Sequence, residues 1–396
     1  MLTIKASLHW LVVWLLLVLL VGSCGAFFLW SLETVTAQRL AHPWLLWLLP
    51  LAGGLVSWVY WRWGGEVEAG HHLLLRKADE GAPVASKPVP LRMLPLILGG
   101  TLVSHLFGAS VGREGTALQM GGAVADQLRL GRTWTSSERR CLMLMGLSAG
   151  FGAVFGTPWA AAIFALEMTY RQRFEWSTLL ACFLSAWGAD QVAQFWGATH
   201  PHEVVHLFAS WTLILWAKLL VAAMLFGLVA RLFLLACQGL AGWMQRSIHF
   251  PPLRPVLGGS LLVLLVMTLG GEAYLGLSLP LLSAAFDQTL PWWDSLAKFG
   301  LTLLSLGTGF KGGEVTPLFV IGATLGNTLA VWMQLPISAM AALGLVGVFA
   351  AATRTPWASS VLAIELFGLD IALFALFVCW IACWVAGRRG LYTPKT

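Results

Sequence analysis

The sequence predicts an all-α protein that crosses a membrane several times through tilted and partly broken helices. Of its 396 residues, 58% are hydrophobic and only 11% are charged, and the mean hydropathy of +0.78 lies far above that of soluble domains. Apolar stretches long enough to cross about 30 Å of hydrocarbon recur along the whole chain. An internal repeat also divides the chain into two similar halves. These observations together indicate an integral membrane protein.

The apolar stretches define the expected membrane spans. The first follows Lys5 and contains Val21-Gly22-Ser23-Cys24, which resembles a cleavable lipoprotein signal. Because the apolar run continues to Trp30, we interpret it as a first transmembrane helix. The clearest spans lie at residues 8–30, 40–61, 141–168, 207–240 and 369–386.

Other apolar segments are short or interrupted by some of the 42 glycines and 17 prolines of the chain. We expect these segments to form half-helices or re-entrant pieces. Irregular backbone at membrane depth persists only where protein or an aqueous cavity covers its polar groups, so such pieces predict a transport pathway. Examples are the segments 94–107, 257–269 and 315–335.

The formal net charge of +6 does not predict nucleic-acid binding, because the basic residues gather in connecting segments. Positively charged connections between membrane spans are typical of the cytoplasmic side. We therefore expect membrane lipid, and no nucleic acid, as a partner. The segment 231–254 has the same character, and the other basic residues concerned are Arg76, Lys77, Lys87, Arg92, Arg129, Arg132, Arg139, Arg140, Arg171, Arg173, Arg388, Arg389 and Lys395.

The internal repeat covers two pairs of segments. Residues 146–168 and 344–366 are identical at 10 of 23 positions, and residues 112–123 and 312–323 at 6 of 12. Glu114 therefore corresponds to Glu314. Duplicated, glycine-broken halves are typical of transporters whose site lies between the repeats near the membrane midplane. We place the first repeat at residues 1–200 and the second at 201–396, and we expect no cytoplasmic regulatory domain.

Three glycine-rich turns precede apolar helices, at residues 69–73, 112–116 and 312–317. The amides and dipole of a helix N-terminus attract an anion without a free cation that would trap it. Glu114 and Glu314 each begin such a helix, where a buried carboxylate is costly unless it has a function. An ionised Glu114 could take the place of an anion, and a protonated one could carry a proton. The alternative for both residues is simple capping of backbone amides.

Further ionisable residues receive weaker predictions. His71 and His72 could donate hydrogen bonds to an anion or relay a proton, or could be packing residues. Glu167 and Glu365 close the two repeat copies, and their symmetry favours an interfacial or structural role. His200, His202 and His206 have a loosely metal-like spacing, but they lie on a polar joint, and we predict no metal site and no cofactor. The six cysteines are expected to be reduced packing residues.

With these residues in view, the chain resembles the CLC family of anion channels and antiporters. Gly112-Arg113-Glu114-Gly115 resembles the G-[KR]-E-G signature at the external gate of that family, and residues 146–168 resemble the helix pair that follows it. Gly312–Pro317 occupies the place of the family's G-[IF]-x-P turn. Gly390-Leu391-Tyr392 resembles the terminal helix that delivers a central tyrosine.

Departures from the chloride-handling members indicate the branch. Gly70-His71-His72 stands where those members have a Gly-Ser-Gly-Ile-Pro turn, Thr116 replaces the proline after the gate motif, and Glu314 replaces an aliphatic residue. This combination resembles the fluoride branch, which exchanges fluoride for protons. That branch more often carries Asn or Met at the central turn. The resemblance implies that Glu114 is the gating proton carrier and that Glu314 and Thr316 line the inner pathway.

The resemblance also implies two inverted repeats, one pathway per subunit and a homodimer. We expect a multi-pass protein of a bacterial-type inner membrane whose partners are fluoride, or chloride, and protons. Fluoride is strongly hydrated, so its site needs hydrogen-bond donors. The expected anion-binding residues are His71, His72, Gly112, Arg113, Gly115, Thr116, Val315, Thr316 and Tyr392.

The main alternative is a chloride/proton antiporter or a voltage-gated type of chloride channel. An enzyme is not expected, because the sequence contains neither a His-Glu-x-x-His helix nor a Gly-x-Ser-x-Gly elbow.

Overall fold

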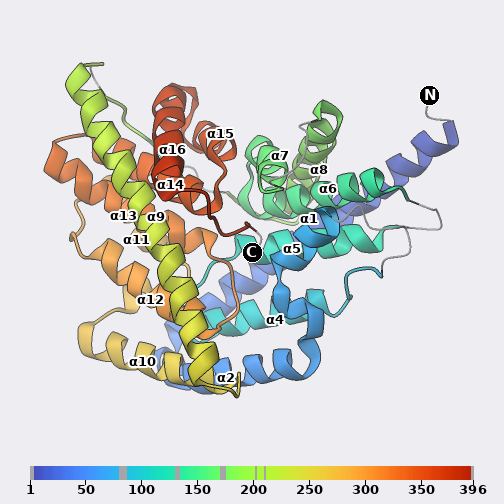
Figure 1. Cartoon of the computed structure of the whole chain (residues 1–396), viewed down its shortest axis with the longest axis horizontal. Coiled ribbons are helices and arrows are strands. Elements are labelled where there is room, and N and C mark those ends of the chain that lie inside the picture. Colours follow the sequence, from blue (N-terminus) through green and yellow to red (C-terminus); the bar gives the residue numbers. More distant parts are fainter. Residues whose placement is uncertain are drawn as a thin grey trace.

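The computed structural model describes residues 4–79, 87–129, 134–169, 175–200, 203–208 and 211–393. These residues form helices joined by turns and loops, with no strand among them beyond an isolated two-residue bridge, and they confirm the all-α class. The first half contains α1 (Ile4–Ala41), α2 (Leu49–Val59), α3 (His71–Asp79), α4 (Met93–Leu106), α5 (Glu114–Gln127), α6 (Ser136–Phe155), α7 (Pro158–Glu167) and α8 (Trp176–Phe195). The second half contains α9 (Leu213–Ser247), α10 (Leu253–Leu269), α11 (Leu279–Asp287), α12 (Asp294–Thr308), α13 (Val315–Met333), α14 (Ile337–Thr353), α15 (Pro356–Phe367) and α16 (Ala372–Ala386) (Figure 1).

Within the described residues, five helical stretches are long and apolar enough to cross a membrane. The first helix continues without interruption through Cys24 to Ala41. The five stretches are Leu8–Ala41, Pro43–Ala78, Leu213–Ser247, Val315–Met333 and Leu369–Ala386. Shorter apolar helices such as α4 and α15 lie among them, which agrees with the expected mixture of spans and short pieces.

Two expected elements differ from the structure. The stretch 141–168 is a helix pair rather than a single span, because Gly156 adopts a left-handed conformation with φ of 72° at the end of α6 and Pro158 begins α7. The stretch 315–335, expected to be broken, is largely the continuous helix α13 of 19 residues. Its Pro317 lies in the first turn, where the missing N–H interrupts no helical hydrogen bond.

In each repeat copy, a pair of glycines brings two helix backbones into contact. A Cβ atom on Gly121 of α5 would lie 2.1 Å from the carbonyl oxygen of Gly146 in α6. A Cβ atom on Gly322 of α13 would lie 2.2 Å from the carbonyl oxygen of Gly344 in α14. The pairs α5/α6 and α13/α14 are therefore packed in the same way, with small residues at the helix crossing.

The two halves are inverted relative to each other. Glu167 at the end of α7 accepts hydrogen bonds from the amides of Trp357 and Ala358 at the start of α15, at 3.1 and 2.8 Å. Glu365 near the end of α15 accepts hydrogen bonds from the first amides of α7, at 2.9 and 2.7 Å. Each helix end meets the beginning of the equivalent helix, so α7 and α15 are antiparallel. These contacts support the structural role expected for both glutamates.

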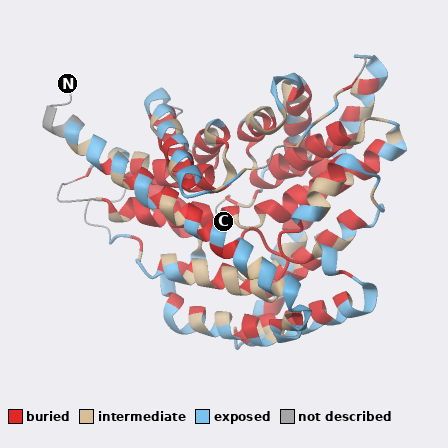
Figure 2. Ribbon diagram, turned by 180° about the vertical axis from the view of Figure 1, so that it is seen from behind, coloured by how far each residue is buried: buried red, intermediate tan, exposed pale blue. Residues whose placement is uncertain are grey.

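The distribution of buried residues fits a protein surrounded by lipid. Figure 2 shows buried segments concentrated through the interior, with exposed positions along the outer helices. Many exposed side chains are large and apolar, including Leu8, Trp30, Leu213 and Trp384. Such extended apolar surfaces are rare on soluble monomers and are ordinary for lipid-facing helices.

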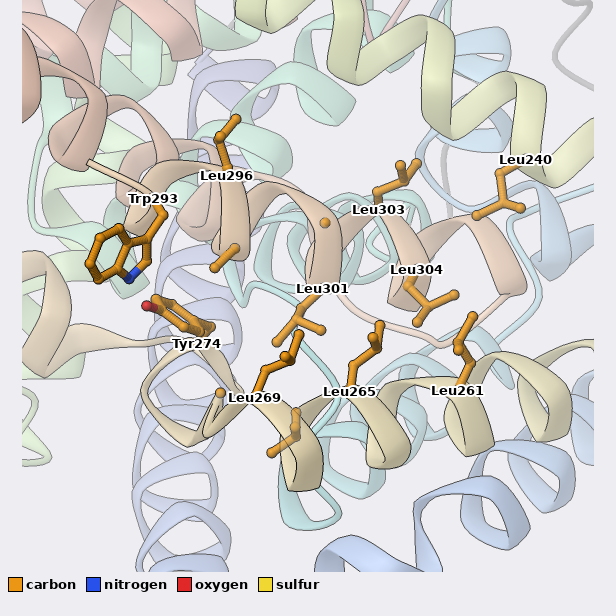
Figure 3. A pocket seen from close by; sticks show the side chains of 14 residues that line it. Leu240, Leu261, Leu265, Leu269, Tyr274, Trp293, Leu296, Leu301, Leu303 and Leu304 are labelled. Carbon is orange, nitrogen blue, oxygen red and sulfur yellow. The ribbon is translucent and has the colours of Figure 1, made fainter. Parts of the chain in front are cut away.

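An apolar pocket of about 580 Å³ lies between α9, α10 and α12. Leucine side chains from all three helices point toward it, and Tyr274 and Trp293 lie at one end (Figure 3). The Tyr274 hydroxyl donates to Oδ1 of Asp294 at 2.7 Å, so this end carries the polar group of the pocket. None of the acidic residues expected to carry ion transport lines this pocket.

Candidate functional site

The two equivalent glycine turns, one before α5 and one before α13, contact each other between the two halves of the chain. The amide of Gly112 donates to the carbonyl of Gly313 at 2.5 Å, and the amide of Gly313 donates to the carbonyl of Gly112 at 2.8 Å. A Cβ atom on Gly112 would lie 3.0 Å from the amide nitrogen of Thr316, so only glycine allows this approach. The antiparallel bridge brings the N-terminal ends of α5 and α13 together.

The carboxyl group of Glu114 occupies the N-terminus of the helix from the other half. Glu114 is 0% exposed. Its Oε2 accepts hydrogen bonds from the amide of Thr316 at 3.1 Å, the hydroxyl of Thr316 at 2.5 Å and the amide of Arg113 at 3.3 Å. Nε of Arg113 lies 3.4 Å from Oε1. These donors suit a negative charge, so a side-chain carboxylate takes the position that a small anion could occupy.

Glu314 supplies a second carboxyl group beside the first. It is the N-cap residue of α13 and is partly buried. A Cβ atom on Gly115 would lie 3.7 Å from its Oε2, which places the carboxyl against the first turn of α5. No hydrogen bond joins this carboxyl to another residue that the structure describes. The carboxyl of Glu314 therefore lacks the hydrogen bonds that fix the carboxyl of Glu114.

Tyr392 and the two histidines lie together. The His71 ring centroid is 4.9 Å from that of Tyr392 and 4.3 Å from that of His72. Tyr392 is 4% exposed, and its hydroxyl has no hydrogen-bond partner in the part of the chain that the structure describes. Both Glu114 and Glu314 are close enough to act electrostatically on this hydroxyl. A buried hydroxyl without a partner suits a transient ligand.

The expectation that a helix delivers Tyr392 is wrong. The last helix, α16, ends at Ala386, where Gly387 has a φ of 84°. Tyr392 stands in a turn that is attached to α14 by a hydrogen bond from the Leu391 amide to the Ala352 carbonyl, at 2.9 Å. The last described segment after α16 runs toward the centre of the molecule in Figure 1.

The remaining expected site residues fall into two groups. Arg113, Gly115 and Val315 surround the meeting point of α5 and α13. The Thr116 hydroxyl instead shares a hydrogen bond of 2.7 Å with the Thr101 hydroxyl of α4. Thr116 therefore connects α5 to α4, and its hydroxyl does not contact the carboxyl of Glu114 through a hydrogen bond.

Some other polar residues have local partners. Nε2 of His200 lies 3.0 Å from Oδ1 of Asp190, and the amide of His206 donates to the Ser338 hydroxyl at 2.9 Å. His202 lies outside the described residues. Among those described, no group of three or more His, Cys, Asp or Glu residues could hold a metal ion. All six cysteines are free thiols.

Arg139 does not belong to an exposed basic connection, contrary to expectation. It is 4% exposed in α6, and Nε and Nη2 donate to the two carboxylate oxygens of Asp126 at 3.0 and 3.1 Å. Four other basic residues of the predicted cytoplasmic set, Arg132, Arg171, Arg173 and Lys395, lie outside the described residues.

The sequence interpretation missed two buried basic residues outside the repeated motifs. Lys298 of α12 is 0% exposed and His105 of α4 is 1% exposed. The signal was available, because an ionisable residue within an apolar segment is a functional candidate by default. Neither residue belongs to the repeated motifs, which supplied most of the predicted site residues.

Comparisons with known proteins agree with this architecture. Residues 53–387 match the voltage-gated chloride channel family. A protein of Pseudomonas syringae pv. tomato described as a chloride/fluoride channel protein is 46% identical over 97% of this chain and 85% of its own length. The crystal structure of a CLC-type fluoride/proton antiporter superposes with a TM-score of 0.92 at 34% identity, covering 98% of both chains.

A slow cyanobacterial Cl⁻/H⁺ antiporter superposes with a TM-score of 0.81 at 20% identity, covering 97% of this chain and 96% of its own. At that level of identity the likeness concerns the fold alone.

Proposed function

Because the chain belongs to the voltage-gated chloride channel family of membrane channels and transporters, we propose that it is a fluoride/proton antiporter that exports fluoride. The proposal rests on one observation above all. The carboxyl of Glu114 lies at the N-terminus of α13, where the amide and hydroxyl of Thr316 donate to it. An ionised Glu114 holds this anion position, and a protonated Glu114 releases it to fluoride while carrying a proton.

Glu314, Tyr392, His71 and His72 form the inner part of the proposed pathway. The Tyr392 hydroxyl, which has no partner among the described residues, donates to the passing anion. The imidazole of His71 lies against the Tyr392 ring and that of His72 lies against His71, and both can donate hydrogen bonds or relay protons. Glu314 provides a second carboxyl for protons on the same route. Donors of this kind compensate for the water that fluoride loses.

The backbone around the gate completes the proposed anion position. The amide and side chain of Arg113 contact the carboxyl of Glu114, Gly112 and Gly115 allow the close approach of α5 and α13, and the amide of Val315 begins α13. Thr116 acts by holding α5 against α4 through Thr101. In this proposal Thr116 positions the gate helix instead of binding the anion through its hydroxyl.

Fluoride is preferred over chloride as the substrate on two grounds. The relative at 46% identity is described as a chloride/fluoride channel protein, and the superposed structure at 34% identity is a fluoride/proton antiporter. The departures at Thr116 and Glu314 also follow the fluoride branch. A chloride/proton antiporter and a passive chloride channel are the alternatives.

We further propose a homodimer in a bacterial-type inner membrane, with the repeat boundary between residues 200 and 201. The face built by α7, α8, α15 and α16 carries exposed tryptophans, which suits burial against a second copy. These are Trp159, Trp187, Trp357 and Trp384. The boundary separates α1–α8 from α9–α16, so that each half keeps one complete copy of the repeat.

Purified protein in liposomes tests the proposed function. Vesicles loaded with fluoride or with chloride are diluted into medium free of both ions, and an ion-selective electrode and an internal pH dye follow the two fluxes. We expect fluoride to leave faster than chloride, protons to enter as fluoride leaves, and a more acidic medium to accelerate fluoride release. Faster chloride release, or fluoride release without proton entry, would refute the proposal.

A further inference from the structure

Three basic side chains from different helices gather around Gly276, in the loop before α11. They are Arg39 in the last turn of α1, His105 in the last turn of α4 and Lys298 in α12. Gly276 is buried and has a φ of 59°. A Cβ atom there would lie 3.9 Å from Nη2 of Arg39 and 3.9 Å from Cδ2 of His105. We call Arg39, His105 and Lys298 the basic cluster.

Lys298 is fixed by three hydrogen-bonding contacts of its amine. Its Nζ contacts the Tyr274 carbonyl at 3.0 Å, the Gly276 carbonyl at 2.8 Å and the Ser278 hydroxyl oxygen at 2.9 Å. The Ser278 hydroxyl gives its own proton to the Leu275 carbonyl. The side chain of Lys298 is therefore fixed in position against the backbone around Gly276.

Arg39 and His105 have donor groups without partners. Nε of Arg39 and Nε2 of His105 are buried and make no hydrogen bond with any described residue. His105 is 1% exposed, and its Nδ1 bonds the Thr101 carbonyl at 2.9 Å. Nε2 is bonded to the carbon that lies beside Gly276, so this nitrogen is close to the other members of the cluster.

No carboxylate neutralises the basic cluster. None of its members forms a salt bridge with an acidic residue that the structure describes. Glu272 acts on Arg39 at longer range and is exposed to solvent. Asp294, one turn before Lys298, accepts the hydrogen bond of the Tyr274 hydroxyl. A basic group shielded from water is normally paired, and a bound anion would supply that partner.

The basic cluster is connected to the loop that leads to Glu114. One turn after Lys298, Thr302 shares a hydrogen bond of 2.9 Å with the Ser110 hydroxyl, and Ser305 accepts the Ser110 amide at 3.0 Å. His105 lies in the last turn of α4, directly after Ser104, and its ring is beside the backbone of Val111, directly before the gate motif.

The cluster lies on the outer side of Glu114. Arg92 precedes α4, and Arg129 follows α5. The basic ends of these helices face the cytoplasm by the positive-inside rule, so the loop between α4 and α5 and the adjacent basic cluster lie toward the opposite side.

We propose that Arg39, His105 and Lys298 form an additional binding site for a small inorganic anion, on the outer side of the gate. This inference rests on the proposed fluoride transport and assigns the site to fluoride. The anion binds there after it has passed the gate at Glu114 on its way out, or before it reaches the gate from outside. The charge of Arg39, the neighbouring Lys298 and the nitrogens of Arg39 and His105 without partners among the described residues suit a compact anion that accepts several hydrogen bonds.

Fluoride uptake into bacterial vesicles of fixed orientation tests the site. Right-side-out vesicles report the outer face of the full-length protein and inside-out vesicles report the inner face, both in a host without its own fluoride exporter. In R39Q, we expect the half-saturating fluoride concentration to rise about tenfold at the outer face and to change less than twofold at the inner face. R39K keeps the charge and should stay within about twofold of the wild type at both faces.

Arg62→Gln removes an exposed arginine outside the cluster and serves as the matched control. Arg39 is only half-buried, which makes its replacement safer for folding than that of Lys298. An equal change at both faces in R39Q, or no change at the outer face, would overturn the outer site while leaving fluoride transport intact. If the wild type carries fluoride at neither face, the proposed function fails, and the fluoride site fails with it.

Discussion

Replacement of Glu114 by glutamine separates the two roles proposed for this side chain. Glutamine has nearly the same shape but carries neither a negative charge nor a titratable proton. In the structure, two donors of Thr316 reach Oε2, at 3.1 and 2.5 Å. A hydrogen bond to a charged group contributes about 1 kcal/mol more than one to a neutral group. The two bonds together should therefore hold the glutamine about 2 kcal/mol less tightly.

A difference of about 2 kcal/mol corresponds to a roughly 30-fold weaker hold on the anion position. In E114Q, we expect fluoride to compete more easily for that position, with an apparent affinity improved by up to about 30-fold. Proton entry coupled to fluoride release should fall to background. The assay is the liposome experiment with the fluoride electrode and internal pH dye.

Glu33→Gln, which changes an exposed glutamate, is the control and should leave both fluxes unchanged. If E114Q still moved protons in proportion to fluoride, the reasoning about Glu114 as the proton carrier would be refuted. An equal loss of coupling in the Glu33 variant would show that the assay responds to a general loss of acidic charge.

Three further substitutions test the contacts around the gate and in the helix packing. Thr316→Val removes the hydroxyl donor and should slow fluoride release about tenfold. Thr316→Ser keeps the hydroxyl and should release fluoride at nearly the wild-type rate. Equal rates for the Val and Ser variants would contradict the role of the hydroxyl. Gly121→Ala places a Cβ atom 2.1 Å from a carbonyl oxygen of α6 and should destabilise the protein by about 2 kcal/mol or more. Gly99→Ala, with no atom within 4 Å of its Cβ, should be tolerated. Thermal unfolding in detergent compares the two variants. Arg139→Met should lower the free energy of unfolding by about 3 kcal/mol, because Asp126 stays buried without its bidentate partner. Adding Asp126→Asn should restore part of the lost unfolding temperature. An unchanged unfolding temperature in the single variant would contradict this prediction.

The repeat made the central architecture predictable. Because Glu114 and Glu314 occupy equivalent positions before apolar helices, the sequence placed both carboxyls at helix N-termini, and the helix starts in the structure agree. The cross-half contact between Glu114 and Thr316 was beyond sequence reasoning, since it depends on how two inverted turns approach each other. Periodicity within one half contains no information about the partner half.

Several departures have local causes that patterns of hydrophobicity cannot reveal. A glycine in a long apolar run can end a helix, as Gly156 does, or permit close packing within one, as Gly322 does. Arg139 resembles an ordinary basic residue of a connection, and only its distance to Asp126 identifies it as buried. Lys298 was the detectable omission, because its charge within an apolar helix was visible in the sequence.

The mutual capping of α7 and α15 by Glu167 and Glu365 has a consequence for how such a chain could arise. A lone copy of the unit would leave the first amides of its short helix without a carboxylate, in surroundings where water is scarce. Two lone copies could satisfy each other only if they entered the bilayer in opposite directions. Joining the two copies in one polypeptide gives them opposite orientations in the membrane, so that every molecule contains both orientations in equal number.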